Sequence, residues 1–209
     1  MKASSRMKAR SLLALLLLGV QGSSFGQEDA GGLEMRFYRN FFSGSMNQLV
    51  QMDEGGEPPF RLVTLSNFQA RSPWDGRRTV NLARLYALVV CGSIVPDKDG
   101  EYELSALCNG KMRFILSTNA DEAGCREIVF EKVGQGKSGA AGGQSADVAF
   151  APNMAATATV SLKAGIPYFV KVYFLPGWAN ALAVGWRLKD DPLPPRIIPG
   201  SNLRLPVRQ

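Results

Sequence analysis

The chain has 209 residues, with 24 lysines and arginines against 18 aspartates and glutamates, three cysteines and no histidine. Without histidine there is no Ser-His or Cys-His nucleophile pair and no imidazole base. The cysteines form no C-x-x-C element, which together with the lack of histidine argues against a zinc site. We therefore expect no cofactor and no catalysis of these classes.

The first 26 residues have the layout of a cleavable export signal. Basic residues precede an apolar stretch from Leu12 to Val20, and the small residues Ser24 and Gly26 follow at a peptidase-like spacing. The apolar stretch is too short to span a bilayer, which takes ~20 residues. The sequence predicts a signal peptide over residues 1–26 and a secreted or periplasmic domain over residues 27–209.

Removing this segment leaves an almost neutral domain. Four of the basic residues lie before residue 27, and the remaining 20 nearly balance the 18 acidic ones. A nucleic-acid-binding protein needs a basic stripe, and the local arginine clusters, within residues 71–84 and 204–208, are expected to lie in solvated loops and strand edges. No second apolar segment reaches membrane length, so we expect neither a nucleic-acid partner nor an integral membrane segment.

The first half of the domain alternates short strand patterns with turns. Residues 34–38 alternate polar and apolar side chains, which is typical of a half-buried strand. Residues 51–59 (QMDEGGEPP) are expected to form a loop, and residues 61–68 a short strand.

The central segment has the clearest strand pattern. Residues 85–95 are rich in strand-forming side chains, residues 96–100 form a turn, and residues 101–107 alternate again, which predicts a β-hairpin. Asn109-Gly110 favours a tight two-residue turn, followed by a strand over residues 111–117.

The second half continues in the same way. Strands are expected over residues 125–133, 155–162, 168–174 and 181–188, and a mobile glycine-rich loop near residues 134–146. Many short strands separated by Gly/Pro turns predict an all-β fold, a single antiparallel β-sandwich of two sheets.

The three cysteines are expected to include one disulfide. In an oxidising compartment, two of Cys91, Cys108 and Cys125 are expected to pair and the third to remain a thiol. All three possible pairings stay open at the level of the sequence.

Three segments resemble the PA-fourteen family, the protective-antigen-type β-sandwiches. Residues 32–38 (GLEMRFY) are similar to the opening strand, and residues 92–104 (GSIVPDKDGEYEL) to a G-x-I-x-P…G-x-Y hairpin. Residues 160–203 contain a closing pattern with L-x-A-G-x-x-Y, a tryptophan and I-P-x-x-x-L. The resemblance implies a β-sandwich and, in sugar-binding members, a calcium ion held by two consecutive aspartates. Here Cys108 and Asn109 replace that pair, so we expect no calcium.

The candidate binding residues lie in loops at one end of the predicted sandwich. They are Asn109, Lys111, Trp178 and Asn180. An exposed Trp178 is suited to stack on a sugar ring, while the two asparagines hydrogen-bond hydroxyl groups. The alternative is that Trp178 folds back over the edge of the sandwich.

Paired carboxylates are the remaining candidates for catalysis. They occur at Asp53-Glu54, Asp97 and Asp99, Asp121-Glu122, and Asp190-Asp191. All stand in polar, loop-like sequence, where we expect ordinary surface charge. The sequence therefore predicts a non-catalytic, calcium-independent module that binds carbohydrate or a cell-surface ligand. The alternative is a structural or assembly module of the cell envelope that binds a partner protein.

Overall fold

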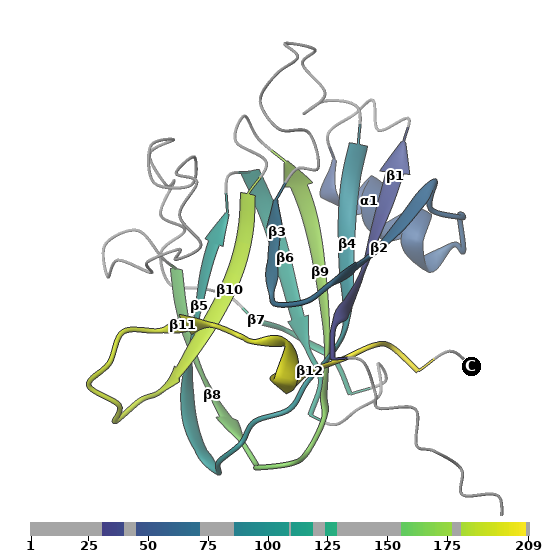
Figure 1. Ribbon diagram of the computed structural model, residues 1–209. Coiled ribbons are helices and arrows are strands. Elements are labelled where there is room, and N and C mark those ends of the chain that lie inside the picture. Colours follow the sequence, from purple (N-terminus) through teal and green to yellow (C-terminus); the bar gives the residue numbers. More distant parts are fainter. Residues whose placement is uncertain are drawn as a thin grey trace, which may run out of the picture.

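The computed structural model describes residues 31–39, 45–71, 86–108, 110–118, 124–128, 156–176 and 181–207. These residues form two antiparallel sheets packed face to face, with one short α-helix on the outside (Figure 1). The all-β sandwich predicted from the sequence is confirmed. The predicted signal peptide and the glycine-rich loop near residues 134–146 lie outside the described residues.

The larger sheet has the strand order β2-β1-β4-β9-β6-β7, and β12 also pairs with β4. Its strands are β1 (Leu33–Arg39), β2 (Arg61–Leu65), β4 (Tyr86–Ile94), β6 (Gly110–Leu116), β7 (Arg126–Ile128), β9 (Tyr168–Pro176) and β12 (Leu203–Arg204). A 3-10 turn, η2 (Gly200–Asn202), precedes β12.

The smaller sheet has the order β11-β10-β5-β8, and β3 also pairs with β10. Its strands are β3 (Gln69–Arg71), β5 (Gly100–Cys108), β8 (Ala156–Leu162), β10 (Ala181–Leu188) and β11 (Arg196–Ile197). The inner faces of the two sheets enclose the main core, in which Phe68, Phe114 and Leu104 are fully buried.

The predicted hairpin over residues 85–107 is wrong, although both of its strands exist. β4 pairs with β1 and β9 in the larger sheet, whereas β5 pairs with β10 and β8 in the smaller one. The connecting residues carry the chain across the core from one sheet to the other. Likewise, β5 ends at Cys108 in the smaller sheet and β6 begins at Gly110 in the larger one. Asn109-Gly110 is therefore not a hairpin turn.

Residues 46–54 form a helix where the sequence predicted a loop from residue 51. Helix α1 (Met46–Glu54) lies against the outer face of the larger sheet (Figure 1). Its Leu49 is fully buried in a second apolar cluster with Tyr38, Val89 and Tyr173. This cover helps to explain why β4, which is mostly apolar, is buried along its whole length.

No disulfide joins Cys91, Cys108 and Cys125 in the structure, so the predicted pairing is not seen. Cys108 faces the core between the sheets. Cys91 faces the opposite side of the larger sheet, where its sulfur lies 4.0 Å from the carboxylate of Glu34. The backbone of that sheet separates the two thiols. Cys125, just before β7, is partly exposed.

No helix among the described residues is both long enough and apolar enough to cross a bilayer.

Candidate functional site

The predicted binding residues are mostly outside the described part of the chain. Asn109, Trp178 and Asn180 are not described, whereas Lys111 is exposed near the start of β6. Gly110 pairs with Pro176 in the sheet register, so the strand ends that flank the two predicted loops are neighbours. Lys111 pairs with Leu175 and lies on the outer face of the larger sheet. The proposed cooperation of the four residues therefore remains a prediction.

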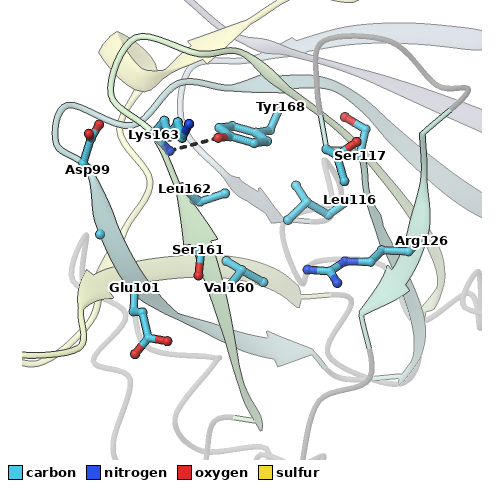
Figure 2. A pocket seen from close by; sticks show the side chains of 12 residues that line it. Asp99, Glu101, Leu116, Ser117, Arg126, Val160, Ser161, Leu162, Lys163 and Tyr168 are labelled. Carbon is cyan, nitrogen blue, oxygen red and sulfur yellow. Dashed lines mark hydrogen bonds between the residues drawn. The ribbon is translucent and has the colours of Figure 1, made fainter.

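A cavity of about 460 Å³ lies at the other end of β6. Leu116, at the end of this strand, is six residues from Gly110, and a strand rises ~3.4 Å per residue, so roughly 20 Å separate the two regions. The cavity opens between β8 of the smaller sheet and β6 and β7 of the larger one (Figure 2). The residues that line it are Asp99, Gly100, Glu101, Leu116, Ser117, Thr118, Arg126, Val160, Ser161, Leu162, Lys163 and Tyr168.

The floor of the cavity is apolar because it is the end of the main core. Leu116, Val160 and Leu162 are inward-facing strand residues of that core. The ring of Tyr168 completes the floor, and its hydroxyl oxygen accepts a hydrogen bond of 2.9 Å from the backbone N–H of Lys163 (Figure 2). An apolar surface of this kind suits the C–H face of a sugar ring or another amphipathic ligand.

Hydrogen bonds fix the rim of the cavity. Asp99 Oδ1 accepts a bond of 2.7 Å from the N–H of Ala164. Ser117 Oγ accepts one of 2.8 Å from the N–H of Phe169. The Ser117 N–H in turn donates to the carbonyl of Phe169 at 2.9 Å. These hydrogen bonds to main-chain groups hold Asp99 and Ser117 in place at the rim of the cavity.

Arg126 was not among the residues predicted to bind a ligand. It pairs with Leu116 in the register of β6 and β7, and its guanidinium points into the cavity toward Val160 (Figure 2). The sequence carried a signal for this placement. In a strand that begins at residue 125 or 126, alternation puts Arg126 and the apolar Ile128 on one face.

A second hollow, of about 530 Å³, lies beside Trp186 and the segment that follows β10. Several of its charged groups are bound within the protein. The Arg187 guanidinium contacts the carboxylate of Glu103 at 3.0 Å, and Asp97 accepts a bond of 2.9 Å from the amide of Asn202. These groups are less available to a ligand than those of the cavity at β7.

The predicted surface pair Asp53-Glu54 needs correction, because the side chain of Asp53 is buried. Its side chain is 1% exposed, and its carboxylate accepts hydrogen bonds from Tyr38 at 2.7 Å and from Arg36 at 3.0 Å. The Lys171 ammonium lies 3.2 Å away. The carboxylate joins the end of α1 to β1 and β9, which gives it a structural role.

The other described carboxylate pairs also make internal contacts. Asp191 accepts a bond of 2.9 Å from the N–H of Leu193, and Asp97 and Asp99 are bonded as described above. Asp121 and Glu122 lie outside the described residues. Within the described ranges, no three Cys, Asp or Glu side chains are grouped so as to hold a metal ion.

Comparison with known proteins supports the fold but does not assign the chain to a family. No family model matches the chain, and no curated protein matches it. Among solved structures, an anti-sigma factor domain-containing protein is similar at 18% identity and a TM-score of 0.55, over 88% of this chain and 51% of that one. An anti-sigma factor domain-containing protein from Clostridium clariflavum is similar at 14% identity and a TM-score of 0.52, over 85% and 48%.

A β-glucosidase from Kluyveromyces marxianus, solved in complex with glucose, is similar at 21% identity and a TM-score of 0.50. The match covers 76% of this chain and 16% of the glucosidase. This chain thus spans about half the length of the two anti-sigma factor domain-containing proteins and about a sixth of the glucosidase. At these identities the likeness supports the two-sheet fold alone.

Proposed function

We propose that this chain is a divergent PA-fourteen-type sandwich that acts outside the cytoplasm as a non-catalytic module binding carbohydrate or another surface ligand. The observation that carries the proposal is the cavity between β8 and β7, with its apolar floor and its rim of hydroxyl and charged groups. Its volume of about 460 Å³ falls within the range of small-molecule sites. One structural neighbour was solved with glucose, which makes saccharides the first ligands to test.

Binding without calcium follows from the residues at the position of the aspartate pair. Cys108 is buried in the core, and its sulfur lies 3.7 Å from the carbonyl oxygen of Gly110. A protonated thiol turned into an apolar core is a poor ligand for a cation that prefers oxygen. Asn109, the second residue of the pair, offers one amide oxygen in place of a carboxylate.

A glycan array followed by calorimetry on the best ligand tests the proposal. Thr118, which is exposed at the cavity, and Trp178, which follows β9 in the sequence, give two separate variants. Loss of binding in Thr118→Trp with retention in Trp178→Ala supports the cavity as the site. The reverse result moves the site to the loops that contain Asn109, Trp178 and Asn180. A parent protein that binds no glycan on the array contradicts the proposal.

A structural or assembly module that docks on an envelope protein is the second candidate function. It is favoured by β2, which has one neighbouring strand among those described and exposes Leu62 by 50% and the adjacent Phe60 by 42%. Open strand edges are templates for pairing with another chain. Co-purification of one stoichiometric envelope protein that is lost in Leu62→Lys, with no glycan signal, would support this function over the first.

A further inference from the structure

Arg126 is a charged residue on the face of β7 that is turned toward the smaller sheet. Arg126 opens β7, and Ile128, two residues later on the same face, belongs to the main core. The register places Arg126 opposite Leu116, another core residue. Figure 2 shows the guanidinium reaching across the cavity toward Val160. Strand alternation therefore turns this exposed cation toward the cavity.

Among the described residues, the acidic groups near Arg126 have other partners. Glu127, its neighbour in sequence, faces the opposite side of β7 and bonds the Arg113 Nε atom at 2.9 Å. Glu101, at the cavity, is paired with Lys189 at 2.9 Å. No hydrogen bond or ion pair joins the Arg126 side chain to another residue in the described ranges.

Among the described residues, the cavity lining thus carries an arginine without an ion-pair partner, beside the carboxylates of Asp99 and Glu101. A second cation, the exposed Lys163, stands on the same lining, whereas the Asp99 carboxylate is held by the N–H of Ala164. A guanidinium presents a planar fork of donors that matches a carboxylate. An apolar floor beside such a fork suits a ligand with one acidic group and one C–H face.

Resting on the proposed function, we infer that the cavity recognises an acidic saccharide, with a sugar carboxylate on the Arg126 guanidinium and the sugar ring against Leu116, Val160 and Leu162. The ligand class is a uronic acid unit within a glycan. Neutral sugars lack the group that satisfies Arg126 and are expected to bind less tightly.

The test compares uronate-containing, sulfated and neutral oligosaccharides on one array and measures the best of each class by calorimetry. Arg126→Gln is expected to weaken uronate binding by roughly tenfold or more, the usual effect of losing a charged hydrogen bond. Arg113→Gln is the matched control, because it removes an arginine from the outer face of the adjacent strand. Added salt is expected to weaken uronate binding to the parent and to have little effect on Arg126→Gln.

Each outcome has a defined meaning. Preferential uronate binding that is lost in Arg126→Gln and kept in Arg113→Gln supports the inference. Equal binding of neutral glycans, a preference for sulfated ones, or uronate binding unchanged in Arg126→Gln overturns it and leaves the proposed function standing. A parent protein that binds no glycan overturns both. Circular dichroism and thermal melting of each variant separate loss of the fold from loss of the contact, since Arg126 is exposed at the cavity mouth.

Discussion

Removing the carboxylate of Asp53 is expected to cost more stability than any other change to a charged side chain described above. The side chain is 1% exposed and lies 3.2 Å from the ammonium of Lys171, whose own side chain is 8% exposed. Breaking a buried ion pair costs roughly 3–5 kcal/mol. Arg36, the second cation, is 28% exposed and keeps its 2.8 Å bond to Glu34. We therefore expect Asp53→Ala to lose about 3 kcal/mol, at the low end of that range.

Urea unfolding followed by tryptophan fluorescence at neutral pH measures this loss. Asp53→Asn keeps the shape of the side chain and removes its charge, so its loss is expected to be smaller than that of Asp53→Ala. Asp190→Asn makes the same chemical change at an exposed turn and is expected to stay within about 0.5 kcal/mol of the parent. If Asp53→Ala also stays within that limit, the ionic cluster beneath α1 does not stabilise the fold and the reasoning is refuted.

The same cluster predicts the direction of a pH effect. Burial alone would raise the pKa of Asp53, but the hydrogen bond from Tyr38 and the charges of Lys171 and Arg36 lower it below its ordinary value. The unfolded chain then binds the proton of the Asp53 carboxyl group more tightly than the folded one. The contribution of ionised Asp53 to the free energy of unfolding is therefore complete above the unfolded pKa of ~3.9, and it disappears as the pH falls through the folded pKa. The stability difference between the parent and Asp53→Asn should stay constant from neutral pH to about pH 5 and shrink below about pH 4.

Three further predictions concern the core and the cavity. Burial raises the pKa of the Cys91 thiol to about 12 and that of the Cys108 thiol to about 11. Alkylation of the native protein with iodoacetamide should therefore modify the partly exposed Cys125 first. Equal labelling of all three cysteines in mass spectrometry would contradict this placement. Gly92→Ala would press a methyl group against the backbone of β12, which is expected to lower the free energy of unfolding in urea by about 1–3 kcal/mol. An unchanged urea midpoint would show that β12 shifts without cost. Tyr168→Phe keeps the ring on the cavity floor and removes one hydrogen-bond acceptor, so a loss of about 1 kcal/mol is expected, and no loss would mean that the bond contributes nothing net.

The strands were predictable from the sequence because they are runs of β-branched, aromatic and alternating residues. β10 has the predicted bounds, and β4 and β5 lie within one residue of theirs. Their partners were not predictable from local patterns. A turn such as residues 96–99 reverses the chain equally well within one sheet or between two, and the core decides which. The helix at residues 46–54 was missed because it is short, and it is stabilised by packing Leu49 against the larger sheet.

The site was predictable only in part. The register supports the expectation that residue 109, just before β6, and residues 177–180, just after β9, adjoin neighbouring strand ends. The cavity at the opposite end could not be foreseen, because it depends on how the edges of β7 and β8 are spaced, which no local pattern contains. Strand alternation alone predicts that Arg126 faces inward. That it has no ion-pair partner among the described residues follows only from the structure, in which the neighbouring Glu127 pairs with Arg113.

The strand order has a consequence for how the protein is made. β9 and β10, at residues 168–188, are interior strands of the two sheets, and their partners β4 and β5 come from the middle of the chain. A growing polypeptide that ends before residue 168 can pair β1 with β4 and β5 with β8, but it lacks the strands that join these pairs to the rest of each sheet. Neither sheet can therefore be completed until residues 168–188 have been synthesised.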